Sequence, residues 1–535
     1  MQVNWLKTLK RIRSPAVLVL VLALLCRITT LFFVQRTWAY SSDDVSWQTI
    51  LFTWTPLNGH VAYLGVKDNF ITNMPFLALL SLLLRPGRTE LFIESALFTS
   101  INFILFYTAG LYFLRKCRVK ISYVSLLPFL WLAIVGKSFG QLFLNTNWRD
   151  FEAGVAFVYL MLVAKAYYGE VRPLKSTPSR LLISVTVVIA GVFVYSDPYF
   201  FYFTLLPIIV FFAVLGYRSE ARRRRALMIS FFGLSSIAVA QIITYLVLVM
   251  GIRMPPGEGL GLAGPRVVLH NIRLAGSSLL TIFGAGLPKA HDAIVVDLAR
   301  TCNLIVVGFV IYLLVISIFG VRKKLDERSI WSGFLALLCL WVLAAYVVSN
   351  AVVDTESYRY LLILIFAAML LVALQAPRLG RVRSFFYLFL VATVVLKLVT
   401  SYIGNIPVTG AEDPNAANYT LIQKVKGLGL QKGYGNYWDA DINTYFSDNE
   451  VQFLPVSCVN GRTVPLYLLV DSAEFYRPAT WSFMVIDPDT AGPSICTKQQ
   501  ILKQFGNPKE VVPLSPKTIL VYDHDILRNM ISKSN

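Results

Sequence analysis

Two adjacent carboxylates, Asp43 and Asp44, follow the first apolar segment of this 535-residue chain. A charged pair at a membrane boundary costs desolvation free energy that an uncharged polar residue would avoid, so packing alone does not explain it. A carboxylate in such a place can act as a general base and take a proton from a hydroxyl group. The pair is therefore the first candidate for catalysis.

Further charged and polar residues lie between later apolar segments, on the side of the membrane that the acidic pair occupies. Arginine binds phosphate through forked, charge-assisted hydrogen bonds, so a base with arginines nearby suits transfer from a phosphate leaving group. The candidate substrate-binding residues are His60, Lys67, Asp68, Arg149, Glu152, Tyr358 and Arg359.

Each candidate also has a structural interpretation that the sequence leaves open. Asp43 and Asp44 could form a solvated loop or cap a helix that begins near Val45. Lys67 and Asp68 could be a surface ion pair, which contributes under about 1 kcal/mol. Arg149 could pair with Glu152 one helical turn along. Arg359 could anchor its helix at the lipid headgroups. The histidines have no mutual spacing that indicates a metal site.

Several enzyme classes lose support from the sequence. No Ser-His-Asp pattern, HExxH motif or phosphate loop is present, and the glycine-rich stretch 427–435 lacks the lysine and serine order of such a loop. We interpret those glycines as turn residues.

The composition indicates a membrane protein, with 56% hydrophobic residues and a mean hydropathy of +0.62. Apolar runs near the ~20 residues needed to cross a bilayer predict a membrane α-helical fold with about 11 (11–13) transmembrane helices. The predicted spans are 15–34, 94–114, 121–135, 151–168, 180–195, 198–215, 226–250, 304–319, 330–348, 360–374 and 385–402.

The net charge of +19 comes from basic clusters in every second loop. This alternation follows the positive-inside rule, so it places the N-terminus in the cytoplasm and argues against nucleic acid as a partner. The first span resembles a signal peptide in its basic start, but its apolar core is long and contains Arg27. We therefore expect it to be retained, and an odd number of spans then places the C-terminal end outside.

Two parts are expected, namely a membrane domain at 1–404 with a long external loop at 35–88, and an extracytoplasmic domain at 405–535. Within that loop, the apolar stretch 76–84 is too short to cross and is predicted to be an interfacial helix. Helical patterns at 417–427 and 497–505 and strand patterns at 451–456, 464–470, 482–486 and 518–522 predict a small α/β or α+β domain. Cys458 and Cys496 both lie in it and could form a disulfide.

These features together resemble the GT-C superfamily of integral-membrane glycosyltransferases, especially the protein O-mannosyltransferases and the lipid A aminoarabinose transferases. The resemblance rests on the acidic pair in a long first external loop, the surface segment that begins at Pro75, and Arg85-Pro-Gly-Arg88 before the second span. The sequence Tyr358-Arg359-Tyr360 at the start of a helix and the external C-terminal domain also fit.

The resemblance implies specific roles for residues of this chain. Asp43 would be the catalytic base, and Asp44 would support it or bind a divalent metal such as Mg²⁺ or Mn²⁺. Arg359 would bind the donor phosphate, with Lys67 and Arg149 as further ligands. Relatives often have Asp-Glu where this chain has Asp-Asp, so the metal requirement stays open.

The function expected from this resemblance is transfer of a sugar, with inversion, from a polyprenyl-phosphate donor to a glycan, lipid or protein acceptor. The reaction would occur on the extracytoplasmic face of a bacterial plasma membrane, with membrane lipids as further partners. Two alternatives stay open, a transporter or flippase of lipid-linked glycans and a non-catalytic membrane assembly protein. Charges at helix ends on one side and the lack of an internal repeat favour the enzyme.

Overall fold

The computed structural model describes most of the chain. The described residues are 14–42, 44–45, 49, 62–63, 77, 79–80, 83–134, 150–168, 177–218, 220–250, 261–287, 293–323, 326–350, 352, 355–403, 413–466, 470–471, 482–487, 496–526 and 530.

Seven helices in these ranges are long and apolar enough to cross a membrane. At about 1.5 Å per residue, a helix of some 20 residues spans the hydrocarbon core of a bilayer. They are α2 (Pro15–Arg36), α5 (Arg88–Lys116), α12 (Glu220–Val249), α14 (Ile294–Lys323), α15 (Glu327–Val348), α17 (Val382–Ile403) and the continuous run of η3 (Thr355–Leu361), α16 (Leu362–Gln375) and η4 (Ala376–Arg378).

The remaining predicted spans correspond to shorter apolar helices. These are α6 (Tyr123–Ala133), α8 (Asp150–Tyr167), α9 (Thr177–Ser196) and the run of α10 (Pro198–Phe200), η2 (Phe201–Leu205) and α11 (Leu206–Arg218). The predicted α-helical membrane fold is confirmed, and the predicted α/β or α+β C-terminal domain is present and contains a mixed sheet. Within the described ranges, seven helices meet the length and composition needed to span, whereas eleven spans were predicted.

Helix α16 forms the centre of the bundle. Every residue from Leu362 to Gln375 is buried, and a helix that is apolar on all sides is stable only when other helices surround it. The ring of Phe366 packs edge-on against Phe106 of α5 at 4.7 Å and lies 6.4 Å from Phe157 of α8. The core of the membrane domain therefore forms around the helix that follows Arg359.

Two buried cations meet the C-terminal end of the short helix α6. The Nζ of Lys397 donates to the carbonyl of Trp131 at 3.3 Å, and Nη1 of Arg27 donates to that of Leu132 at 3.1 Å. The Nε of Arg27 also donates to Thr99 at 2.6 Å. The last carbonyls of a helix lack partners within the helix and carry partial negative charge, so the two cations stabilise a helix end that is buried within the bundle. Arg27 thus has a structural role in the first span.

The C-terminal domain contains a six-stranded mixed sheet in the order β4-β3-β2-β6-β8-β7. Strand β2 is parallel to β3 and to β6, and the other pairs are antiparallel. Helix α20 packs on one face of the sheet, and α18 and α19 pack on the other. The elements are α18 (Ala416–Gly427), β2 (Lys432–Gly435), α19 (Tyr437–Phe446), β3 (Gln452–Val459), β4 (Arg462–Pro465), β6 (Phe483–Ile486), α20 (Lys498–Phe505), β7 (Glu510–Leu514) and β8 (Lys517–Val521).

Side chains that alternate along the strands build the two sides of this domain. Met484 and Leu520 pack with α20, whereas Phe483 and Ile519, their neighbours along the strands, pack with α18 and α19. Strands β2 and β7 and helix α19 were not predicted from the sequence. The interpretation of stretch 427–435 as turns was wrong for its last four residues, which form the central strand β2.

Glycine is needed at position 433 because the Phe483 ring of β6 lies where a side chain would be. A Cβ at this position would overlap that ring. We expect Gly433→Ala to destabilise the domain by about 1–3 kcal/mol through overpacking, measured by hydrogen exchange of strands β2 and β6 in the full-length protein. Gly427→Ala is the matched control, since its Cβ would meet nothing within 4 Å. Equal exchange in both variants would contradict this explanation.

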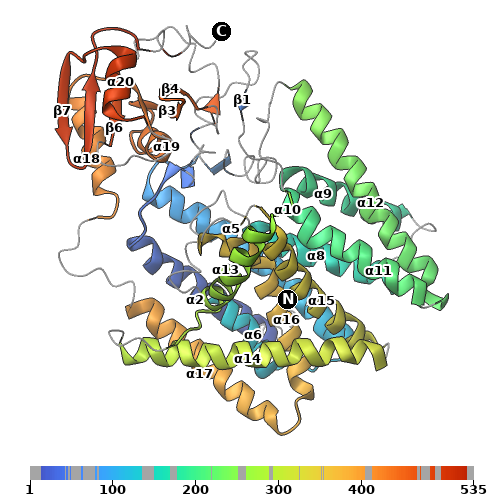
Figure 1. The fold of residues 1–535 in the computed structure, drawn as a ribbon. Helices are drawn as coiled ribbons and strands as arrows, with labels where there is room; N and C mark the ends of the chain where they lie inside the picture. The colour runs from blue at the N-terminus through green and yellow to red at the C-terminus, as the bar shows by residue number, and fades with distance from the viewer. Residues whose placement is uncertain are drawn as a thin grey trace, which may run out of the picture.

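The C-terminal domain sits at one end of the helical bundle, over the end of α2 and the start of α5 (Figure 1). Because α15, α16 and α17 alternate in direction, the end of α15, the start of α16 and the end of α17 lie at this same end. We name it the domain face. The first loop also reaches the domain, since β1 (Ala62–Tyr63) pairs with β5 (Val470–Asp471).

Candidate functional site

Asp44 of the acidic pair lies just beyond the end of α2, on the domain face. Asp44 is 1% exposed, and its Oδ2 accepts hydrogen bonds from the backbone N–H and the hydroxyl of Ser41, at 2.8 and 3.1 Å. The side chain of the third residue of a helical turn thus binds the residue before the turn, as in a capping box. Asp44 is therefore a buried residue inside the turn, so it lies neither in a solvated loop nor at the cap of a helix that begins near Val45, while Asp43 lies outside the described residues.

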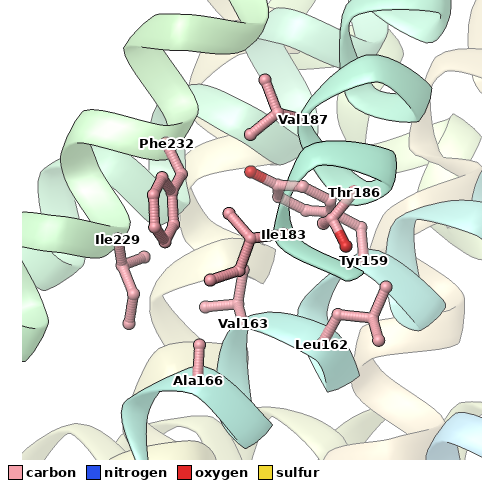
Figure 2. A pocket seen from close by; sticks show the side chains of 9 residues that line it. All are labelled: Tyr159, Leu162, Val163, Ala166, Ile183, Thr186, Val187, Ile229 and Phe232. Carbon is pink, nitrogen blue, oxygen red and sulfur yellow. The ribbon is translucent and has the colours of Figure 1, made fainter. Parts of the chain in front are cut away.

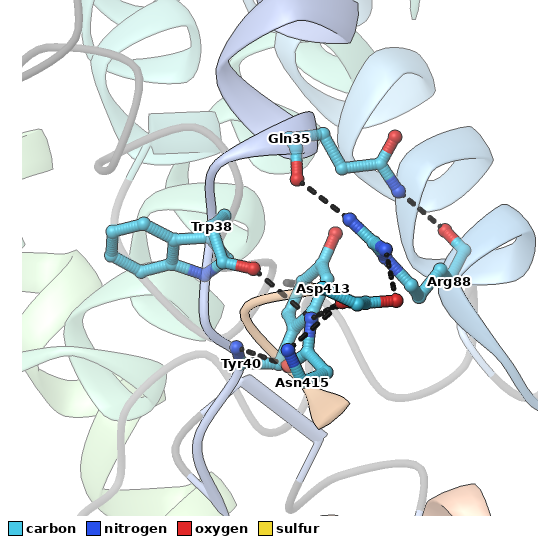
Figure 3. Close-up of polar contacts among 6 residues, drawn as sticks. All are labelled: Gln35, Trp38, Tyr40, Arg88, Asp413 and Asn415. Carbon is cyan, nitrogen blue, oxygen red and sulfur yellow. Dashed lines mark hydrogen bonds and ion pairs between the residues drawn. The ribbon is translucent and has the colours of Figure 1, made fainter. Parts of the chain in front are cut away.

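The polypeptide before this turn is held by the C-terminal domain (Figure 3). The amide of Asn415, which is fully buried, accepts from the N–H of Tyr40 at 2.9 Å and donates to the carbonyl of Trp38 at 3.1 Å. A single side chain from the C-terminal domain therefore pairs two backbone groups of the segment that leads to the acidic pair.

A second set of contacts in Figure 3 joins α2, α5 and the domain. Nη1 of Arg88 forms an ion pair with Asp413 at 2.8 Å, and Nη2 donates to the carbonyl of Gln35 at 3.1 Å. The side chain of Gln35 in turn donates to the carbonyl of Arg88 at 2.6 Å. Because both members of the ion pair are about a third exposed, solvent weakens it, and its main effect is to fix geometry.

Helix α19 contacts the acidic turn itself. The hydroxyl of Ser42, which is fully buried, accepts from the backbone N–H groups of Asp441 and Ile442, at 3.1 and 3.4 Å. The hydroxyl of Thr49, seven residues after Ser42, lies 3.4 Å from the carbonyl of Asp441. The residues on both sides of Asp43 are therefore in contact with the C-terminal domain.

Apolar packing supports these polar contacts. Tyr40, Val45 and Leu91 form one buried cluster with Ile442 and Tyr445 of α19. The hydroxyl of Tyr445 donates to Glu90 of α5 at 2.6 Å. Burial, together with the neighbouring Glu90 carboxylate, raises the pKa of Tyr445 above its ordinary value, so the hydroxyl keeps its proton and remains a donor.

Arg359 lies on the domain face in η3, before the buried part of α16. Its guanidinium is partly exposed, and it lies 5.2 Å from the centre of the Tyr360 ring, whose hydroxyl accepts from Nη2 at 3.3 Å. Tyr360 stacks on Tyr199 of α10 at 4.8 Å, with the rings nearly parallel. Asp197 accepts the backbone N–H of Tyr199 at 2.8 Å, so it fixes the residue that supports this stack. Tyr358 is buried.

An apolar groove begins at this stack and follows α15. One cavity of about 550 Å³ is lined by Tyr199, Leu262 and Ser349, and a second of about 550 Å³ lies further from the domain face, beside Ile318 and Phe334. Both cavities share Trp341 and Ala344, so they form one groove. The α15 residues that line it run over 16 positions, about 24 Å of helix, which is most of the thickness of the hydrocarbon core.

The π-helical segment η2 fixes the residue at the junction of the two cavities. The indole N–H of Trp341 donates to the carbonyl of Tyr202 in η2 at 2.9 Å. A π-helical turn shifts the usual hydrogen-bond pattern of a helix and often occurs at functional sites. Neither this groove nor the role of Trp341 was predicted from the sequence, because the residues that line the groove lie in ordinary apolar runs.

A third cavity, shown in Figure 2, lies among α8, α9 and α12. Its volume is about 30 Å³ and its lining is apolar apart from the hydroxyls of Tyr159 and Thr186. Room for one or two water molecules is too little for a substrate. We assign it to helix packing.

Several predicted site residues lie outside the described part of the chain. These are Asp43, His60, Lys67, Asp68 and Arg149, together with the side chain of Glu152 at the start of α8 and residues 76, 78, 81 and 82 of the predicted interfacial helix 76–84. Of the predicted set, the structure therefore places the side chains of Asp44, Tyr358 and Arg359. All three lie on the domain face.

The described residues do not assemble a metal site. No group of three or more His, Cys, Asp or Glu side chains with suitable geometry occurs among them, and Oδ2 of Asp44 already accepts two hydrogen bonds from Ser41. Asp44 on its own does not supply the ligand set that Mg²⁺ or Mn²⁺ requires. We therefore assign no reaction step to a metal.

Sequence reasoning missed the residues that connect the two parts of the molecule, namely Glu90, Asn415 and Tyr445. Their signals are weak, since each is a single polar residue in an ordinary helical or turn context. Only their burial at the interface shows their role, because a buried polar group needs a partner.

No protein-family model and no curated protein matches the chain. Among solved structures, it is similar to the oligosaccharyltransferase of the archaeon Archaeoglobus fulgidus in three forms. These are the apo form (TM-score 0.47, 12% identity, 89% of this chain and 69% of that chain), the complex with Zn and sulfate (0.45, 11%, 89% and 68%), and the form tethered to an acceptor peptide containing the NVT sequon (0.44, 11%, 89% and 69%).

At this identity and these TM-scores, the similarity assigns no substrate and no residue role to the present chain. The fold and the site define a polytopic membrane protein whose C-terminal domain, with its mixed sheet, packs on the domain face of the helical bundle.

Proposed function

We propose that this protein is a glycosyltransferase that moves a sugar from a polyprenyl-phosphate donor to an acceptor hydroxyl at the domain face. The observation that carries the proposal is the apolar groove whose lining includes Tyr199, the residue on which Tyr360 stacks. A groove lined by Trp341 and Ala344 suits one long isoprenoid chain, and the guanidinium of Arg359, which lies 5.2 Å from the centre of the Tyr360 ring, suits the phosphate that such a chain bears.

In this reaction the carboxylate of Asp43 takes the proton of the acceptor hydroxyl, whose oxygen forms a bond to C1 of the sugar. The bond between C1 and the phosphate oxygen breaks, and polyprenyl phosphate leaves with the bonding electrons. Attack from the face opposite the phosphate inverts the configuration at C1. Arg359 stabilises the charge that develops on the leaving phosphate.

The domain face is, in this proposal, the extracytoplasmic side of a bacterial plasma membrane. The basic loops at the opposite ends of the spans support this orientation, since positive charge is enriched on the cytoplasmic side. The disulfide between Cys458 and Cys496 in the C-terminal domain supports the same orientation, because such bonds persist in oxidising compartments. The domain, which touches both sides of the acidic turn, would help to bind a glycan, lipid or protein acceptor.

We expect Arg359→Gln to raise the KM for the lipid-linked donor about 10- to 100-fold, since a charge-assisted hydrogen bond contributes about 1.5–3 kcal/mol. Arg359→Lys keeps the charge without the forked geometry and should give a smaller increase. Donor titration with purified protein in detergent or nanodiscs measures both. Arg381→Gln, an exposed site between η4 and α17 at the opposite end of the bundle, is the control. An unchanged KM in Arg359→Gln would remove this residue from the donor site.

The proposed activity is tested by comparing the envelope glycans of a deletion strain with those of the wild type by mass spectrometry. A missing sugar that returns with the wild-type gene, but not with an Asp43→Asn gene, would support the proposal. Purified protein should then transfer that sugar from extracted polyprenyl-phosphate lipids. If reconstituted vesicles instead move the labelled lipid across the bilayer and form no glycosidic product, the protein is a transporter.

A further inference from the structure

Helix α13 (Pro265–Phe283) lies across the end of α15 on the domain face. The side-chain amide of Asn271 donates to the carbonyls of Val347 and Ser349, at 3.0 and 2.8 Å. The hydroxyl of Ser278, two helical turns further along α13, is 2.9 Å from that of Tyr346. Positions about 10 Å apart on α13 thus meet a single turn of α15, so the two axes cross. Because α15 is a spanning helix that ends at Val348, α13 lies at the membrane boundary.

The chain before α13 is fixed at the same boundary. The N–H of Gly261 donates to the side chain of Asn350 at 2.8 Å, and the N–H of Ala263 donates to the carbonyl of Val348 at 2.8 Å. After α13, Gly284 ends the helix in the left-handed conformation with φ of 63°, and its carbonyl accepts from Asn303 of α14 at 3.0 Å. Contacts at both ends therefore hold the helix in one orientation.

One face of α13 is packed on the protein, and the next face around the helix is apolar and exposed. The packed face includes Asn271, Ala275 and Ser278. Leu269 and Ile272 on the adjacent face are 57% and 53% exposed. Large apolar side chains that are this exposed beside the end of a spanning helix suit contact with acyl chains.

A basic stripe follows on the next face around the helix. Arg266, His270 and Arg273 are spaced i, i+4 and i+7, so they lie on one side of α13, and all three are exposed. None of them forms an ion pair with any residue in the described part of the chain. The order around the helix is thus protein contact, apolar surface and basic surface.

We propose that this stripe binds the anionic headgroups of bilayer lipids. With Leu269 and Ile272 in the acyl region, the basic residues on the adjoining face lie at headgroup depth, where arginine side chains extend toward phosphate. The charge complementarity selects anionic over neutral lipids. This inference does not depend on the proposed transfer reaction.

Other occupants fit the surface less well. A second copy of the chain would bring the same two arginines against these and would be repelled. An acidic soluble partner would match the charge but would leave the apolar face without a role. An anionic bilayer surface uses both faces at once.

Photo-crosslinking of full-length protein in nanodiscs tests the proposal. The probe is a phosphatidylglycerol analogue with a photoreactive headgroup, used in a phosphatidylcholine background and read by peptide mapping. We expect labelling of the segment 265–283 that unlabelled phosphatidylglycerol displaces and phosphatidylcholine does not. Arg266→Gln with Arg273→Gln should weaken displacement by phosphatidylglycerol roughly 20- to 30-fold, since each basic residue near an anionic surface contributes about a factor of five.

The variant with lysine at both arginine positions keeps the charge and should behave like the wild type. Thermal unfolding of each variant confirms that it is folded, as expected for exposed positions. Labelling that misses α13, equal displacement by both lipids, or a crosslink between two protein copies at α13 would overturn the proposal.

Discussion

Replacing Asp43 by asparagine is expected to lower the rate of sugar transfer by about 10²- to 10⁴-fold, the usual contribution of a general base. The amide has nearly the same size and cannot accept the proton of the acceptor hydroxyl. Because the contacts of the neighbouring Ser42 and Asp44 do not involve this side chain, the change should leave the fold and membrane insertion intact. Single-turnover assays with donor-saturated protein measure the chemical step directly.

Asp44→Asn is the matched control for this prediction. The oxygen of an asparagine at 44 can still accept the N–H of Ser41, so the turn should survive and the rate should fall by only a few fold. A loss as large as that of Asp43→Asn would show that Asp44 does more than cap the turn. Full activity of Asp43→Asn would show that the base is another residue.

Asn415→Ala is expected to release the segment before the acidic pair from the C-terminal domain. The change leaves the N–H of Tyr40 and the carbonyl of Trp38 without their partner in a buried interface, which costs roughly 2–4 kcal/mol in total. We expect faster hydrogen exchange of the backbone from Trp38 to Thr49. A fall in kcat with little change in donor KM should accompany it, because the groove and Arg359 lie on other helices.

Asn418→Ala provides the control, since it removes the same type of side chain three residues later, in the first turn of α18, where no hydrogen bond joins it to the described residues of the first loop. Its exchange and activity should match those of the wild type. If Asn415→Ala leaves the exchange of 38–49 unchanged, the domain does not hold the acidic turn. If exchange rises but kcat stays constant, the contact is structural only.

The helical part of the fold was predictable because its signal is local. A helix in a bilayer must satisfy its backbone within itself, so apolar runs such as 226–250 and 385–402 identify helices without knowledge of their neighbours. The same holds for α20, whose capping residue Thr497 and following periodicity are readable from the sequence. Strand β2 was missed because its sequence, KGYG, has low strand propensity, and only the Phe483 ring over Gly433 explains the glycine.

The candidate site was predictable in part for the same reason. The types of Asp43, Asp44 and Arg359 and their places at helix ends indicated chemistry on one side of a membrane. The sequence could not show that Asp44 binds Ser41, or that the stack of Tyr360 on Tyr199 marks the mouth of a groove. Both depend on residues that meet only after the helices pack.

By itself, the sequence determined that this is a helical membrane protein with a separate C-terminal domain and an acidic pair after its first span, because hydropathy and charge order act along the chain. Only the tertiary structure decided that the domain contacts Tyr40, Ser42 and Val45, the described residues around that pair. Asn415 and Tyr40 are 375 residues apart, and the local hydrogen bonds of Asn415 to Asp413 do not predict this contact. A hydrogen bond over that separation exists only because two folded surfaces fit together, and no local pattern encodes such a fit.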